Sequence, residues 1–222
     1  MPHKQWLKKY TKLDYLEGIL RNRHLHLGNP SDWDDKNDSE GIRLFSAGHS
    51  DFKVLSTCLT EAADRFHFWH VFGEREKGVC LWFDKERLIH DIQTDSSLIA
   101  DSVLYRTPKE VAQLSANQIP FAKREQYRDE SEFRVLRVQK ASNTPIDKFL
   151  FSQDSLRRIH LNPWLSNNEA DLAKAWITDT LEDEFGHVEV LQNRTLGSKR
   201  WLDAISLVAE QGNDETSKNA VG

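Results

Sequence analysis

The sequence predicts an α+β fold in which one mixed sheet carries helices on its faces. Two observations favour this class. Short β-type apolar runs and helical patterns are interspersed without strict βαβ alternation. The chain also lacks a glycine-rich phosphate loop, which argues against a doubly wound nucleotide-binding sheet. With 222 residues the chain is long enough to build one sizeable core.

Apolar periodicity and capping signals place the individual elements. Strands are expected over 6–10, 54–59, 79–83, 132–138, 159–161 and 188–191. Helices are expected over 11–20, over 62–77, behind Thr107-Pro108, and behind the capping box that begins at Ser166. The polar stretch 29–41 is predicted to be a loop.

Composition indicates how the chain is divided into domains and in which cellular compartment it works. We expect a single domain over 1–209 and a disordered tail over 210–222, because the tail has almost no apolar content. Cys58 and Cys80 form no Cys-x-x-Cys pair, so neither a zinc site nor a disulfide framework is expected. The first residues lack the apolar core of a signal peptide, and no run is long enough to span a membrane. These features predict a cytoplasmic protein without a membrane partner.

The net charge of −5 argues against a generic nucleic-acid binder, although a local basic patch would be compatible with it. The sequence does not indicate an oligomeric state.

The run from Tyr127 to Glu132 contains the strongest candidate for chemistry. Glu130, Glu132 and Arg134 stand two residues apart, so they share one face if the stretch is extended. Two close carboxylates repel, and the pKa of one rises unless Arg134 offsets the repulsion. Such a pair can orient a hydroxyl or stabilise a positive transition state. The structural alternative is a solvated strand face with an ordinary Glu–Arg ion pair.

Two other segments offer polar groups to a ligand. Ser56 and Thr57 lie in a predicted strand, where they can bind a ribose or a carboxylate or simply reflect β-propensity. The acidic stretch from Asp34 to Glu40 lacks the EF-hand pattern; solvation and turn formation explain much of it, and a magnesium site is the functional rival.

The aromatic segment 66–72 belongs to a predicted helix. Its rings can form a core face or stack on a base. His67 and His70 are three residues apart, but no third metal ligand is signalled.

Several segments, taken in order, resemble the bacterial family known as domain of unknown function 2971. The most specific are FWHVFGEREKGVCLWFD and KREQYRDESEFRVLR, which are similar to its Trp-x-x-Tyr, Gly-Val-Cys-Leu-x-Phe and Tyr-x-x-Glu-x-Glu-x-Arg signatures. LKKYTKLDYLEGIL, LHLGNPSDWDDKND and VLSTCLTE look like its earlier segments. Phe72 stands where the family has tyrosine, and Asp34-Asp35-Lys36 lacks the family's proline. The family name implies no reaction.

A more distant resemblance implies one. Ser56-Thr57-Cys58 and Glu130-Ser131-Glu132 look like the Ser-Thr-Ser strand and the Glu-x-Glu pair of the Arg–Ser–Glu ADP-ribosyltransferases, with Lys9 in place of the arginine. The resemblance implies a strongly bent, split sheet and NAD as a substrate, with no metal. Glu132, Glu130 and Ser56 would then be catalytic. The residues expected to bind NAD are Lys9, Tyr10, Thr57, Trp69, Phe72, Tyr127 and Arg134.

In these roles Glu132 would stabilise an oxocarbenium-like centre, Glu130 would act on the acceptor, and Ser56 would support Glu132. Trp69 or Phe72 would stack on nicotinamide. The acceptor, a protein or a nucleic acid, is open, and a toxin or phage-defence role follows by analogy alone. Two alternatives stay open: a metal-dependent nuclease that uses the Asp34–Glu40 stretch, and a non-catalytic sensor or binding module.

Overall fold

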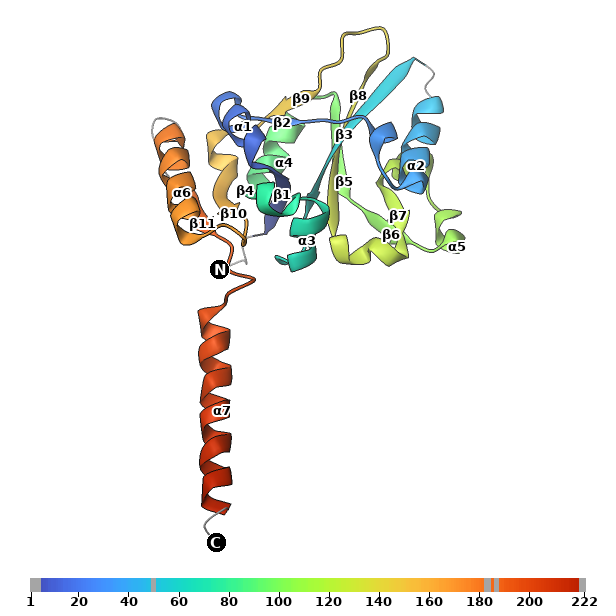
Figure 1. Cartoon of the computed structure of the whole chain (residues 1–222). Helices are drawn as coiled ribbons and strands as arrows, with labels where there is room; N and C mark the ends of the chain where they lie inside the picture. The colour runs from blue at the N-terminus through green and yellow to red at the C-terminus, as the bar shows by residue number, and fades with distance from the viewer. Residues whose placement is uncertain (1–4, 49–50, 182–184, 186–187, 220–222) are drawn as a thin grey trace.

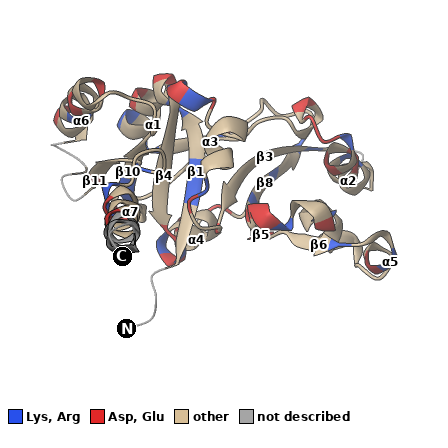
Figure 2. Ribbon diagram, turned by 60° about the horizontal axis from the view of Figure 1, so that its bottom comes forward, with Lys and Arg blue, Asp and Glu red and all other residues tan. Residues whose placement is uncertain are grey.

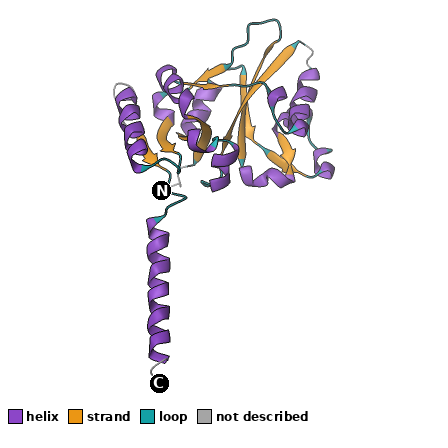
Figure 3. Cartoon of the chain, in the orientation of Figure 1, coloured by secondary structure: helices purple, strands orange, loops and turns teal. Residues whose placement is uncertain are grey.

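A computed structural model gives the fold for residues 5–48, 51–181, 185 and 188–219. Its centre is a seven-stranded mixed sheet in the order β11-β10-β4-β1-β3-β8-β5, and helices lie on both faces (Figures 1 and 3). Every strand pair in it is antiparallel except β10 with β11. The strands are β1 (Trp6–Lys12), β3 (Phe52–Thr60), β4 (Gly78–Asp84), β5 (Leu98–Ser102), β8 (Glu132–Lys140), β10 (Leu156–Leu161) and β11 (Glu189–Gln192). The predicted α+β class is confirmed.

Two small sheets and seven helices complete the described chain. Strand β2 (His24–His26) pairs with β9 (Lys148–Leu150), and β6 (Leu104–Arg106) pairs with β7 (Ala122–Arg124). The helices are α1 (Leu16–Asn22), α2 (Lys36–Ala47), α3 (Phe66–Val71), α4 (Lys85–Gln93), α5 (Pro108–Val111), α6 (Asn167–Leu181) and α7 (Lys199–Asn219). Among the described helices, none is both long and apolar enough to cross a membrane.

The large sheet is split between β1 and β3. These strands share a single register pair, Lys8 with Thr60, whereas β1 pairs with β4 along its whole length. Further along β3, Gly28 takes the place of β1 and forms a bridge with Ser56. The edge of β3 at Cys58 therefore faces a gap. The gap splits the sheet, as the resemblance to ADP-ribosyltransferases implied.

The two faces of the sheet carry different cores. On one face, α1, α4 and α6 pack on a single large apolar cluster that includes Leu7, Leu55, Phe133 and Ile159. On the other face the apolar side chains form two smaller clusters. One lies around Trp69 beside α3, and the other lies between α2 and β8.

All six strands predicted from apolar runs are present, with ends that differ by a few residues. Two other predictions were wrong. The stretch 29–41 is not wholly a loop, because Asp35 caps α2 by accepting a hydrogen bond from the Asn37 N–H. The helix expected over 62–77 is only the short α3. Glu74 and Arg75 adopt left-handed backbone conformations, and these cannot continue a helix.

The C-terminal segment contains the last helix. The structure describes α7 as far as Asn219, and residues 220–222 lie outside the described residues; disorder over 210–222 stays a prediction. Glu, Gln and Lys in this stretch lose little rotamer freedom in a helix. The helix stands away from the rest of the fold (Figures 1 and 3), and Figure 2 shows it nearly end-on.

Candidate active site

A cavity of about 980 Å³ lies at the split in the sheet. It sits between the two small clusters, with the start of α2 on one side and the end of α3 on the other. Most of the site residues predicted from the sequence line it: Lys9, Tyr10, Ser56, Thr57, Phe72, Tyr127, Glu130 and Glu132. Lys9, Ser56 and Glu132, which come from three different strands, therefore meet at one cavity.

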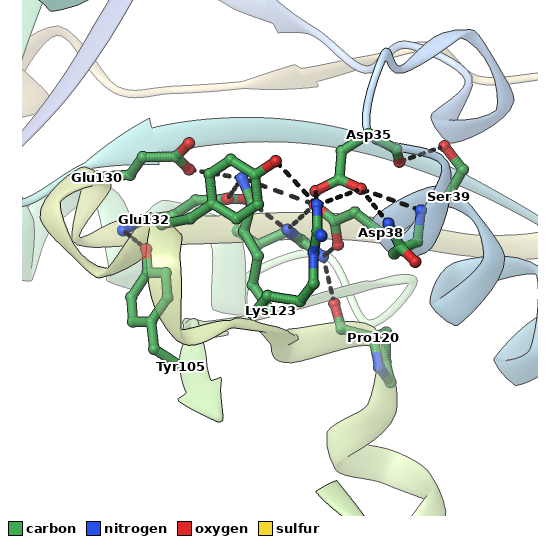
Figure 4. A network of polar contacts seen from close by, with 12 residues as sticks. Asp35, Asp38, Ser39, Tyr105, Pro120, Lys123, Glu130 and Glu132 are labelled. Carbon is green, nitrogen blue, oxygen red and sulfur yellow. Dashed lines mark hydrogen bonds and ion pairs between the residues drawn. The ribbon is translucent and has the colours of Figure 1, made fainter. Parts of the chain in front are cut away.

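Glu132 is the first residue of β8, and its buried carboxylate lines the cavity within the network of polar contacts shown in Figure 4. Its Oε1 accepts a 2.7 Å hydrogen bond from Arg134 Nε, and its Oε2 lies 3.2 Å from Lys123 Nζ. Its backbone N–H donates to the Tyr105 hydroxyl at 2.7 Å. Both carboxylate oxygens thus have a cationic partner, and the Tyr105 hydroxyl holds the backbone N–H of the same residue in place.

Arg134 holds the Glu132 carboxylate in place. Its side chain is fully buried, and its two terminal nitrogens donate to the two carboxylate oxygens of Asp38 at 2.8 and 2.9 Å. One of them also donates to the Pro120 carbonyl at 2.8 Å. The Trp33 ring lies 4.9 Å from the guanidinium carbon. The predicted alternative, a solvated strand face, is therefore wrong for Glu132 and Arg134.

Glu130 reaches the same site from a different element. It ends the 3₁₀ segment η5 (Glu125–Glu130), and Ser131 turns the chain in the left-handed region before β8 begins. Glu130 is therefore not on the strand face with Glu132 and Arg134, as an extended run would require. Its carboxylate still lies 2.5 Å from Lys123 Nζ, so Lys123 bridges both glutamates.

Glu130 and Glu132 have different surroundings, which shift their pKa values in opposite directions. Burial alone raises the pKa of Glu132, but the positive charges of Arg134 and Lys123 outweigh burial and lower the pKa to about 2. The Cys58 thiol beside the carboxylate contributes to the same lowering. For Glu130, burial dominates and raises the pKa, although Lys123 opposes it. Glu132 is therefore an anion at neutral pH, whereas Glu130 holds a proton more readily.

Lys9 reaches into the gap between β1 and β3. Its ammonium donates a 3.1 Å hydrogen bond to the Cys58 carbonyl, on the strand edge that β1 leaves unpaired. Burial lowers the pKa of Lys9, and the nearby Cys58 and Glu132 partly offset this. With Lys9, the cluster holds three cationic side chains against the carboxylates of Asp38, Glu130 and Glu132, so its formal charges balance.

Two buried hydroxyls on β3, Ser56 Oγ and Thr57 Oγ1, form no hydrogen bond within the described part of the chain. Strand alternation puts Ser56 on the cavity face with Cys58 and Thr60, whereas Thr57 lies on the core face between Leu55 and Leu59. Since a buried polar group without a partner costs free energy, the Ser56 hydroxyl is suited to binding a polar ligand.

The aromatic residues divide into two groups. Phe72 is 42% exposed and lines the cavity together with Tyr127, whose ring lies 4.8 Å from Lys123 Nζ. Trp69, in contrast, is completely buried and donates from its indole nitrogen to Asp64 at 3.2 Å. It belongs to the small core under α3, so the prediction that Trp69 binds a ligand was wrong. Tyr10 borders the cavity, but its hydroxyl donates to the same Asp64 at 2.8 Å.

The acidic stretch does not form a metal site in the described part of the chain, where no three His, Cys, Asp or Glu residues are grouped suitably for a metal ion. Asp35 caps α2 and lies 3.3 Å from Arg124, and Asp38 is held by Arg134. His67 Nε2 lies 3.2 Å from Asp129. Because cationic side chains already occupy the buried carboxylates, the geometry does not favour the metal-dependent nuclease.

No protein-family model matches the chain, and no curated protein matches it. Its resemblance to the domain of unknown function 2971 family therefore stays a prediction. Among solved structures it is similar to DarT from Thermus sp. 2.9. In complex with NAD+, DarT is 14% identical, with a TM-score of 0.42 over 87% of this chain and 97% of that chain.

The complexes of DarT with carba-NAD+ and with ADP-ribosylated ssDNA give 13% and 15% identity and TM-scores of 0.41 and 0.40. Each covers 87% of this chain, and 98% and 96% of the respective DarT chains. A likeness this distant leaves any function to be argued from the residues of this chain.

Sequence reasoning missed part of the site. Lys123, Tyr105 and Trp33 were not predicted to take part, and Asp38 was noted only as one of several loop acids. Each comes from a different element than Glu132, and the separation in sequence reaches 96 residues between Asp38 and Arg134. The one available signal for Asp38 was an excess of acidic residues next to a tryptophan, and that pattern is also typical of a solvated turn.

Proposed function

We propose that this chain is an ADP-ribosyltransferase that uses NAD as a substrate. The observation that supports this best is the convergence of Lys9, Ser56 and Glu132 on one cavity, although they lie on three different strands. The cavity, at about 980 Å³, is at the upper end of the range for small-molecule sites and is large enough for a dinucleotide.

In the proposed reaction, the bond between the nicotinamide nitrogen and C1′ of the ribose breaks. The bonding electrons leave with nicotinamide, and positive charge develops on the ribose. The Glu132 carboxylate, buried and ionised, stabilises that charge without having to reorganise solvent. The acceptor then forms a bond to C1′ and gives its proton to a base.

Glu130 is the residue we assign as that base. Its carboxylate is partly buried and its pKa is raised, so it can take and hold the acceptor's proton more readily than Glu132 can. Lys123 lies between the two carboxylates and keeps them from repelling each other.

Ser56 supplies a hydroxyl for ribose, and Lys9 supplies positive charge for a phosphate or ribose oxygen. Phe72 and Tyr127 supply rings on which a base or nicotinamide can stack. Arg134 is a positioning residue, because it touches Glu132 rather than the cavity, and Asp38 positions it in turn. The transfer assay determines whether the acceptor is protein, DNA or RNA.

The deciding experiment compares two Glu→Gln variants that remove the same charge. Glu132→Gln should lower NAD turnover by two or more orders of magnitude, which corresponds to about 3 kcal/mol of transition-state stabilisation. Glu125→Gln, in the exposed ion pair with Arg128, should leave turnover unchanged. Because Glu132 is buried, its variant also loses stability, so turnover is measured per folded molecule at a temperature well below both melting transitions.

Glu130→Gln should reduce transfer to the acceptor more than hydrolysis of NAD. If the wild type binds NAD but consumes none with protein, DNA or RNA, the chain is a binding module and the enzyme proposal fails. Equal loss of turnover in Glu125→Gln would also contradict the assignment of Glu132.

A further inference from the structure

Helix α7 carries an exposed apolar stripe. Trp201, Ile205 and Val208 follow one another at helical spacing, and Leu202 lies beside them. These four side chains are between 47% and 68% exposed. The polar residues of this part of the helix, including Asp203 and Glu210, lie on the opposite side. An amphipathic pattern of this kind is typical of a helix that packs against another surface.

The same chain presents a partly exposed, largely aromatic sheet face, with the cationic groups of Lys8 and Arg158 over its tryptophan rings. Strand alternation buries Leu7, Phe83 and Ile159 in the large core, so their neighbours Trp6, Trp82 and His160 point to the other face and stay partly exposed. Trp82 stacks on His160 at 4.6 Å and meets Trp6 edge-on at 5.9 Å. On the edge strand β11, Leu191 pairs with His160 in register and is 39% exposed, extending this row.

The helix does not reach its own sheet face in this structure. Asn193, just after β11, is buried and holds the chain through hydrogen bonds to Asp64 and the Leu161 carbonyl. From Arg194 to Glu210 every residue is exposed, and α7 extends away from the body (Figure 1). The apolar stripe is thus exposed to solvent and accessible to another molecule.

We propose that α7 docks on the β1-β4-β10-β11 face of a second copy of this chain, in a reciprocal exchange. In a two-fold dimer the same helix-on-sheet contact forms twice, and this doubles the area buried. The apolar stripe covers only about two helical turns, too few for a stable pair of α7 helices alone. A helix of 21 residues is about 30 Å long, enough to cross four strands that together span about 14 Å.

The first test compares two substitutions on opposite sides of α7 in the full chain. Sedimentation velocity should show a dimer for the wild type and a monomer for Ile205→Glu. Leu207→Glu is the matched control: Leu207 is also exposed, at 59%, but it lies off the stripe, so this variant should remain a dimer. Since both side chains are exposed in the single chain, neither change should unfold it. A monomeric wild type, or equal effects of the two variants, would overturn the proposal.

The second test identifies the surface that receives the helix. Leu191→Glu alters the sheet face and leaves α7 intact, so this variant should also be monomeric. Mixing it with Ile205→Glu leaves one of the two contacts free of substitutions, and association between the two variants should return. A Leu191→Glu chain that is still dimeric would indicate helix-to-helix pairing instead. A mixture that remains monomeric would indicate that α7 of one chain does not bind the sheet face of another. Either result would overturn the proposed exchange.

Discussion

Strands β3 and β8 have two very different faces. Toward the large core they present Leu55, Leu59, Phe133 and Val135, all buried among apolar side chains. Toward the cavity the alternate positions present Ser56, Cys58, Thr60, Glu132 and Arg134. Apart from Cys58, which is of intermediate burial, both sets are buried, so burial does not distinguish them. The difference is that the four core residues need only apolar contacts, whereas the cavity face encloses charges that must be paired.

This contrast suggests why the polar face is present. Replacing a buried ionic cluster with apolar residues of similar volume is often neutral or stabilising, so stability alone does not require Glu132, Arg134 and Asp38. Once such a cluster exists, however, removing one member leaves an uncompensated charge. The apolar face should therefore govern stability alone, and the polar face should govern both stability and chemistry.

The largest expected effect on stability comes from Arg134. Arg134→Met should lower the free energy of unfolding by about 3–5 kcal/mol, because Asp38 and Glu132 then lose their shared buried partner. Arg128→Met removes the same group from an exposed ion pair and should lower the free energy of unfolding far less. Urea unfolding of both variants measures the difference. Similar values for the two would show that the buried cluster is weakly coupled to folding.

A change on the apolar face should separate stability from activity. Leu55→Ala should lower the free energy of unfolding by about 2–5 kcal/mol through lost burial and a residual cavity. NAD turnover per folded molecule should not change, because Leu55 points away from the cavity lining. Parallel urea unfolding and turnover assays test this, and a large loss of specific activity would mean that the two faces are not independent.

The pH dependence of stability should differ between wild type and Glu132→Gln. The pKa of Glu132 is lowered in the folded state, so its contribution is fully present above about pH 4.5 and is lost as the pH falls toward 2. The wild type should therefore be more stable than the variant at pH 6. The difference in free energy of unfolding between the two should decrease by on the order of 2–3 kcal/mol by pH 2.5. Thermal melts across this range measure it. A gap that is constant with pH would mean that the Glu132 carboxyl does not titrate as proposed.

The smallest effect on stability is expected at Ser56, the neighbour of Leu55 on the cavity face. Its hydroxyl has no partner within the described chain, so Ser56→Ala should change the free energy of unfolding by less than about 1 kcal/mol. The affinity for NAD, measured by calorimetry, should nevertheless fall if the hydroxyl binds ribose. Unchanged affinity would remove Ser56 from the site.

Local sequence patterns predicted the strands and the shared face of Glu132 and Arg134. Alternation along β8 placed Glu132 and Arg134 on one face, and the apolar runs located β3 and β4, because both patterns act over a few residues. Local signals also predicted the cap of α5 and the start of α6 correctly.

Tertiary structure decided the partners of those residues. Asp38, Lys123 and Tyr105 reach Glu132 or Arg134 from separate elements, and Ser131 turns Glu130 out of the strand yet leaves its carboxylate near Lys123. The Trp69 side chain is buried in a core, whereas Phe72, three residues later, lines the cavity. Periodicity carries no information on contacts between distant segments, so a buried ionic cluster and a solvated strand face look alike until the chain has folded.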